Sequence, residues 1–136
     1  MSRLLGNECD PTQLSALGLA FVGDGVYDLI IREELACRGN RPVKELNLEK
    51  VEFVRCQAQA ELVKKIEPLL TEEEADVLRR GRNAHVTHAP KSATMAQYHA
   101  ATAFEALLGY LYLSDRIERI RDLIRLGAGK NADREE

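Results

Sequence analysis

The sequence lacks the residues and segments that mark several classes of protein. It has no tryptophan and only three cysteines, Cys9, Cys37 and Cys56. Because the cysteines are odd in number and no two have CxxC spacing, we exclude a disulfide framework and a zinc knuckle. No apolar run reaches ~18 residues without a charge, so we expect no membrane span. No basic segment followed by an apolar one opens the chain as a secretory signal would. We therefore expect a cytoplasmic protein.

A chain of 136 residues has the length of one domain. We expect a single domain over residues 1–136, with a core over about 12–127 and a charged tail over 128–136. Hydrophobic residues are 45% and charged residues 30% of the chain, which is typical of a globular protein. The net charge of −3 does not favour nucleic acid, so an RNA-binding site would need positive charge concentrated in one place.

Proline, glycine and capping residues divide the chain into stretches with helical periodicity, and no segment alternates like a strand. The sequence therefore predicts an all-α fold of about six to seven helices. Asp10-Pro11 is expected to start the first helix and Gly39 to stop it. The first two predicted helical stretches cover about 13–38 and 42–65, the second with a break near 55–57. A short helix runs from the Thr71 capping box to about 80, and a longer one runs from the Thr94 cap to about 113. The last helix starts from a cap at Ser114 or Asp115 and stops at Gly127.

The first predicted helix carries an acid in an apolar setting. Residues 17–31 are apolar on nearly every face, which predicts a central helix of the core or of an interface. Asp24 lies in the middle of this run, between Gly23 and Gly25. Each glycine inside a helix costs roughly 1 kcal/mol relative to alanine. We therefore expect another helix, a metal or a phosphate to approach the backbone closely here.

The helix over 95–113 repeats this pattern, because residues 100–113 contain a single acid, Glu105. Its small residues Ala101, Ala106 and Gly109 would let a neighbouring helix approach. Two carboxylates that meet across such a packing form a hard-oxygen site for Mg²⁺, which takes one or two carboxylates and fills its shell with water and phosphate oxygens. The alternative is that Asp24 and Glu105 pair with bases such as Arg32 or Lys64 and serve packing alone.

Asp28 follows Asp24 by four residues and so lies on the same helix face. It is a candidate for a place beside the metal ligands. The alternative, which we favour from spacing alone, is a residue at the boundary of the core, half in solvent.

Residues 77–103 contain no acid, and they gather positive charge ahead of Glu105. The run from Arg79 to Asn83 is similar to a turn that grips phosphate, with Gly81 allowing close approach. The alternative is a solvated helix end whose arginines complement the helix dipole. His85-x-x-His88 has no evident third ligand, so we interpret these histidines as surface residues. Few aromatics are available for base stacking, which favours recognition of a duplex by its shape.

Two segments now resemble a known family. Residues 19–27 (LAFVGDGVY) are similar to the signature helix of the ribonuclease III family, and residues 102–113 (TAFEALLGYLYL) are similar to its second catalytic helix. The similarity runs from about 14 to 126 and includes residues 79–84 and 89–91. The closer match is Mini-ribonuclease III, the short bacterial branch without a double-stranded-RNA-binding domain.

The resemblance implies an all-α, homodimeric endoribonuclease that cuts double-stranded RNA with Mg²⁺, or with Mn²⁺ as a substitute, and leaves 5′-phosphate and 3′-hydroxyl ends. It implies precursor large-subunit (23S) ribosomal RNA as the substrate. Asp24 and Glu105 match the catalytic, metal-binding acids. Two further acids of the larger enzymes are Ala20 and Thr102 here, which suggests weaker metal binding with more water in the shell. The remaining expected site residues are Arg79, Arg80, Arg82, Asn83 and Lys91 for the RNA backbone, and Asp28 and Thr102 beside the metal ligands.

Two other functions stay open at this point. One is a duplex-RNA binder that keeps the fold but cannot hold metal with two acids. The other is a helical interaction module in which the acids are core ion pairs and the arginines a solvated face. For the expected dimer, the candidates for packing at the seam are Tyr27, Phe104, Leu108 and Tyr112.

Overall fold

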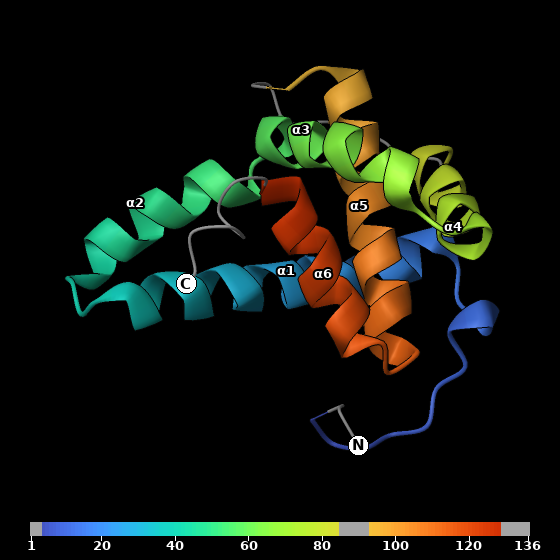
Figure 1. The fold of residues 1–136 in the computed structure, drawn as a ribbon, viewed down its shortest axis with the longest axis horizontal. Coiled ribbons are helices and arrows are strands. Elements are labelled where there is room, and N and C mark those ends of the chain that lie inside the picture. Colours follow the sequence, from blue (N-terminus) through green and yellow to red (C-terminus); the bar gives the residue numbers. More distant parts are fainter. Residues whose placement is uncertain (1–3, 85–92, 129–136) are drawn as a thin grey trace.

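The computed structural model describes residues 4–84 and 93–128, and within these ranges it is all-α, as predicted. Six α-helices and two short 3-10 helices follow one another in the described residues (Figure 1). None of these helices is long and apolar enough to cross a membrane. The elements are η1 (Pro11–Gln13), α1 (Ala16–Arg38), α2 (Val43–Val54), α3 (Cys56–Ile66), η2 (Glu67–Leu69), α4 (Glu72–Arg82), α5 (Met95–Leu113) and α6 (Ile117–Ala128).

Capping residues set most helix ends where the sequence predicted them. Thr71 and Thr94 each form a complete capping box, with Glu74 and Gln97 as the third residues. The predicted break between the second and third helices occurs at Arg55, whose backbone is extended.

Three predicted ends were wrong. Ser114 is the C-cap of α5 instead of a cap of the last helix, which begins at Ile117. Asp10-Pro11 starts only the short η1, and the side chain of Ser15 caps α1 by accepting a hydrogen bond from the Gly18 backbone N–H at 3.0 Å. Helix α4 continues to Arg82 instead of ending near residue 80.

Helix α5 is the centre of the fold, with α1, α3 and α4 packed around it (Figure 1). The side chains of Phe104, Leu107, Leu108 and Leu111 are completely buried. The Tyr27 ring of α1 meets the Phe104 ring edge to face, with 5.1 Å between the ring centroids. Tyr27, Phe104 and Leu108 therefore belong to the core within one chain, and their prediction as residues of a dimer seam was wrong.

The prediction that two apolar helices approach closely is confirmed at Gly23 and Gly109, where α1 crosses α5. A Cβ atom built on Gly23 would lie 1.7 Å from the carbonyl oxygen of Glu105, and one on Gly109 would lie 2.0 Å from that of Leu19. Both distances are far below van der Waals contact, so only glycine permits this crossing. Gly25 differs, because nothing in the described chain lies within 4 Å of an added Cβ there.

Gly81 in α4 serves packing in the same way. Its added Cβ would lie 2.8 Å from the Cα of Ala103 in α5. Sequence analysis assigned Gly81 to close approach of a phosphate. In the structure it is instead buried against α5, which brings the last turn of α4 to the level of Glu105 along that helix.

Helix α1 is covered on one side only within this chain. Of the two places expected for this helix, the core or an interface, the core accounts for its covered side. Leu19, Tyr27 and Leu35 are buried, but Phe21 is 84% exposed and Leu29 is 56% exposed. The single chain therefore leaves an apolar stripe of α1 open to its surroundings.

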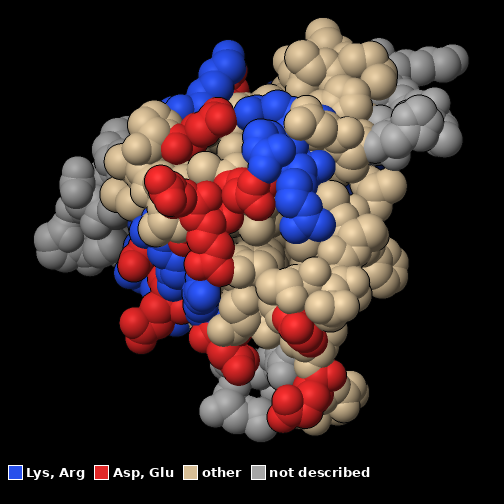
Figure 2. Space-filling view, turned by 90° about the vertical axis from the view of Figure 1, so that its right-hand side faces the viewer, with Lys and Arg blue, Asp and Glu red and all other residues tan. Residues whose placement is uncertain are grey.

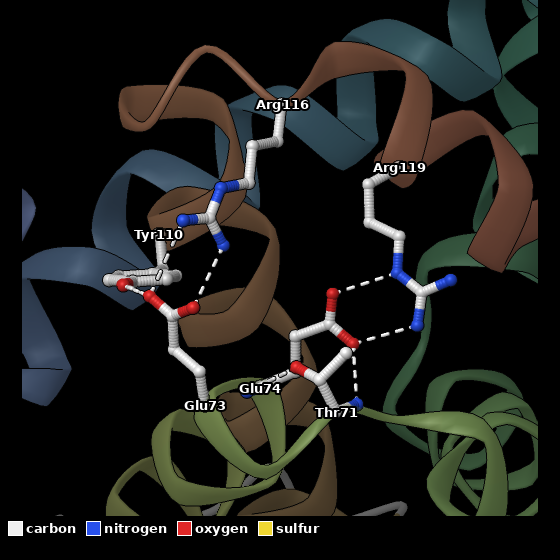
Figure 3. A network of polar contacts seen from close by, with 6 residues as sticks. All are labelled: Thr71, Glu73, Glu74, Tyr110, Arg116 and Arg119. Carbon is white, nitrogen blue, oxygen red and sulfur yellow. Dashed lines mark hydrogen bonds and ion pairs between the residues drawn. The ribbon is translucent and has the colours of Figure 1, made fainter.

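A polar network ties the start of α4 to α5 and α6 (Figure 3). The buried carboxylate of Glu74 accepts two hydrogen bonds of 2.7 Å from Arg119, and these bonds lower the pKa of Glu74 against the effect of burial. Its neighbour Glu73 accepts hydrogen bonds from Tyr110 and Arg116. A buried carboxylate needs such partners, so the network fixes the direction in which α4 runs.

The glycine crossing leads to the first prediction. Gly23→Ala and Gly109→Ala force a methyl group against backbone atoms, so each should destabilise the protein by about 3 kcal/mol or more, at or beyond the upper end of overpacking costs. The matched control is Gly25→Ala in the same helix, which should be neutral or stabilise by up to about 1 kcal/mol. Thermal unfolding followed by circular dichroism measures all three. Wild-type melting of the Gly23 or Gly109 variant would contradict the proposed contact.

Candidate functional site

The structure brings Asp24 and Glu105 together where α1 crosses α5. The Glu105 backbone carbonyl is the atom closest to a Cβ placed on Gly23, the residue before Asp24. The two carboxyl groups interact directly. Asp24 is exposed and Glu105 is half-buried, which corrects the expectation of two buried acids. The pair therefore has an inner member, Glu105, and an outer member, Asp24, that is open to a ligand.

The environment of Glu105 disfavours its negative charge. Burial, and then the neighbouring charge of Asp24, raise the pKa of Glu105 to about 7, while a hydrogen bond from Gln59 opposes this shift. A carboxylate in such a place is ionised readily only when positive charge is nearby. Perturbed carboxyl groups of this kind cluster at functional sites.

Gln59 of α3 is a member of the site that sequence analysis missed. Its side chain is 2% exposed. Its Nε2 atom donates to the Val54 carbonyl oxygen at 2.7 Å and to Glu105 Oε2 at 3.2 Å. The Cys56 thiol of the same helix is also near, since burial and the charge of Glu105 raise its pKa. No local signal marks Gln59, because a glutamine within a helix is usually a surface residue.

The donor set fits a hard divalent cation. It consists of two carboxylates, and among residues 4–84 and 93–128 no group of three or more histidine, cysteine, aspartate or glutamate side chains is placed to hold a metal. Mg²⁺ accepts a site of one or two carboxylates because water and substrate phosphates complete its shell. A cation between Asp24 and Glu105 would also offset the burial and the repulsion from Asp24 that together raise the pKa of Glu105.

The bases suggested as partners of the acid pair are engaged elsewhere. Arg32 Nε lies 2.5 Å from Asp28 Oδ2, and Lys64 Nζ lies 3.4 Å from Glu61 Oε2. The interpretation of Asp24 and Glu105 as an ion pair with Arg32 or Lys64 was therefore wrong.

The two residues expected beside the metal ligands have other partners. Asp28 is half-buried, as its boundary position suggested, and Lys50 Nζ of α2 donates to its Oδ1 at 3.0 Å. Although burial acts in the opposite direction, hydrogen bonds from Arg32 and Lys50 lower the pKa of Asp28. The buried Thr102 donates its hydroxyl to the Tyr98 carbonyl one turn earlier, at 3.1 Å.

The arginines expected to bind RNA lie in the last turn of α4 and are paired rather than free. Arg82 Nη1 lies 3.1 Å from Glu67 Oε2, and Arg79 forms an ion pair with Asp76. Arg80 is half-buried and donates to the Leu14 carbonyl oxygen at 3.5 Å. Basic and acidic side chains lie next to each other on the face drawn in Figure 2. The expected concentration of unopposed positive charge is thus reduced by neighbouring acids.

Asn83 is exposed and forms the C-cap of α4. The predicted RNA contact Lys91 lies outside the described residues. So do His85 and His88, which the sequence led us to interpret as surface residues, and the charged tail after 128.

Comparison with known proteins agrees with this arrangement. Residues 17–116 match the family model described as Ribonuclease III domain. A Mini-ribonuclease 3 of Thermoanaerobacter sp. (strain X514) is 50% identical over 113 residues, which cover 83% of this chain and 80% of the relative. A Mini-ribonuclease 3 of Symbiobacterium thermophilum is 44% identical over 119 residues, which cover 88% of this chain and 92% of the relative.

A solved structure agrees as well. The crystal structure of a protein from Fusobacterium nucleatum matches with a TM-score of 0.79 at 34% identity, covering 86% of this chain and 95% of that one. Because the family model spans most of the chain and the relatives are similar over most of their length, the chain belongs to the ribonuclease III family, a family of endoribonucleases.

Proposed function

We propose that this protein is a divalent-metal-dependent endoribonuclease that cleaves double-stranded RNA in the cytoplasm. The observation that carries the proposal is the meeting of Asp24 and Glu105 at the glycine crossing of α1 and α5. Relatives named Mini-ribonuclease 3 support it. We extend the proposal to precursor large-subunit (23S) ribosomal RNA as the substrate, on the basis of the resemblance to that branch of the family.

Asp24 and Glu105 would hold Mg²⁺, or Mn²⁺ in its place. The bound ion would lower the pKa of a water molecule and stabilise the charge that develops on the phosphodiester. Glu105 must give up its proton to bind a cation, and its pKa of about 7 makes this step sensitive to pH near neutrality. Asp24, on the open side of the pair, is the member that substrate reaches first. Asp28 and Thr102 stay proposed supporting residues through their positions, one helical turn after Asp24 and one before Glu105, although their hydrogen bonds go to other partners.

The last turn of α4 would hold the RNA backbone. Gly81 packs α4 against Ala103, two residues before Glu105 in α5. The last turn of α4 and the acid pair therefore lie at the same height along α5. Guanidinium groups bind phosphate oxygens through two parallel hydrogen bonds. The proposed contacts are Arg79, Arg80, Arg82, Asn83 and Lys91.

A second copy of the chain would cover the apolar stripe of α1. Leu17 and Phe21 lie one turn apart, and Leu29 lies two turns farther on. Three large exposed hydrophobic residues on one helix are unusual for a surface that faces only water. A two-fold dimer would bury them and would place one acid pair near each strand of a duplex. This stripe replaces the seam expected from the sequence.

The second prediction tests the catalytic pair. Asp24→Asn and Glu105→Gln remove one charge each at nearly constant volume, so each should lower cleavage of a defined RNA duplex in Mg²⁺ by at least about 100-fold, comparable to removal of one electrostatic stabiliser in other active sites. Binding of the duplex, measured in Ca²⁺, should stay within about twofold of wild type. Wild-type turnover by either variant would overturn the assignment of these acids. Binding by the wild-type protein without any cleavage would favour the alternative of a silent duplex binder.

Thermal melting in EDTA is the control for folding. At pH 8, above the pKa of Glu105, the wild-type protein carries an unfavourable buried charge that Glu105→Gln removes. The variant should therefore melt at or above the wild-type temperature at pH 8, and this gain should shrink as the pH falls toward 5 and Glu105 takes up its proton.

The third prediction concerns the α4 arginines. Arg79→Ala combined with Arg82→Ala should weaken duplex binding in low salt. It should also lower the slope of log affinity against log salt by ~0.9 for each phosphate group that the protein no longer neutralises, if A-form RNA behaves as B-DNA does. Arg80 is left in place because it also holds the Leu14 carbonyl. The matched control is Arg121→Ala with Arg125→Ala, a pair of exposed arginines in α6. Equal slopes for wild type and the α4 variant would mean that these arginines do not contact the RNA backbone.

The fourth prediction concerns assembly. Phe21→Ser should convert a dimer into a monomer at micromolar concentration without lowering helix content, because the Phe21 ring makes little contact within its own chain. The control is Leu126→Ser, a half-exposed leucine on α6. Light scattering after size exclusion measures the mass of both. A monomeric wild-type protein would exclude the proposed dimer.

A further inference from the structure

We propose that Gln59 is the positioning residue of the metal site. Its side-chain amide holds one oxygen of Glu105, so that the carboxylate is set to bind a divalent cation together with Asp24. This inference rests on the proposed function, because it assigns a role toward the cation that Asp24 and Glu105 would share.

The contacts of Gln59 determine how its amide is oriented. Val54 O, at 2.7 Å, and Glu105 Oε2, at 3.2 Å, are both acceptors, so the amide NH₂ group must face them. Val54 is the last residue of α2, where carbonyl groups lack partners within the helix. The break between α2 and α3 thus supplies a fixed acceptor that holds the amide from one side while Glu105 is held from the other.

The chemistry of the donor is suited to a metal site. A lysine or arginine at this position would also hydrogen-bond to Glu105, but its positive charge would compete with the cation for the carboxylate. The neutral amide of Gln59 orients Glu105 and leaves its negative charge unopposed. Residues that hydrogen-bond to metal ligands set the orientation of those ligands and contribute to metal affinity.

Packing among the apolar residues of α3 does not account for a glutamine here. The Oε1 atom of Gln59 is buried and has no hydrogen-bond partner among the described residues. A buried acceptor without a partner destabilises a protein. The neighbouring buried residues of α3, Ala60, Val63 and Ile66, are apolar. An apolar side chain at position 59 would avoid this cost but would remove the donor to the Val54 carbonyl oxygen. The bond to Val54 secures the end of α2, and the bond to Glu105 is the contact that neither packing nor the helix end requires.

The experiment is a calorimetric titration of the full chain with Mn²⁺ in the absence of RNA. Gln59→Met keeps the length of the side chain and removes the amide, so it should weaken Mn²⁺ binding by about 10-fold or more. Its melting temperature in EDTA should stay close to that of the wild type, because the loss of the bond to Val54 is offset by removal of the unpaired Oε1 atom. Its duplex binding in EDTA should be unchanged. Cleavage should recover as the Mg²⁺ concentration is raised, because the defect is in metal affinity. The matched control is Lys64→Met, an exposed change in the same helix.

Two further variants separate the possible outcomes. Should Gln59→Met fail to fold, Gln59→Asn takes its place, because this shorter amide keeps the polarity but cannot span both acceptors, and it too should weaken Mn²⁺ binding. Asp24→Asn in the same titration tests the site itself. If the wild type binds no ion, or Asp24→Asn binds as the wild type does, the proposed function fails. If Asp24→Asn no longer binds the ion but the folded Gln59 variant binds like the wild type, only the role of Gln59 is overturned.

Discussion

The contact on which the structure depends is the crossing of α1 and α5 at Gly23 and Gly109. Each glycine faces a backbone carbonyl of the other helix at a distance that leaves no room for a side chain. The carbonyl that faces Gly23 belongs to Glu105, and Asp24 is the next residue of α1. The close packing of the two helices and the meeting of the two acids are therefore one geometric fact. Any change that separates the helices also separates the acids.

Helix α5 carries this arrangement to the rest of the molecule. Its face toward α3 receives Gln59, and its face toward α4 receives Gly81. The network of Glu73 and Glu74 with α5 and α6 then fixes the other end of α4. Two neighbours of α5 thus bring side chains to Glu105, an acid from α1 and an amide from α3, and α4 carries the arginines that we propose for the RNA backbone. The close-packed apolar core below these contacts fixes the positions of the helices relative to one another.

Local signals were enough to predict the all-α class, most helix ends and the close approach at Gly23, because capping and helix-interior glycine act within a few residues. They could not tell which side of α1 is covered. When a helix is apolar on all faces, its sequence does not indicate which face lies against the core. Phe21 and Tyr27 could therefore not be told apart from the sequence, although Phe21 is exposed and Tyr27 is buried. Gln59 was missed because its role depends on Glu105, 46 residues away in sequence. The pairing of Arg82 with Glu67 was missed for the same reason, since it joins two different helices.

The ion pairs of the α4 arginines do not oppose a role in RNA binding. The pair of Arg82 with Glu67 and that of Arg79 with Asp76 are largely exposed, and exposed ion pairs contribute only about 0–1 kcal/mol. An arginine that leaves its carboxylate partner to bind a phosphate group of the RNA therefore loses little free energy, and the phosphate oxygens suit the same guanidinium group. In the free protein the acids hold the arginines in place and limit repulsion among them. An otherwise acidic chain can thus carry a binding surface for a polyanion without a large excess of positive charge.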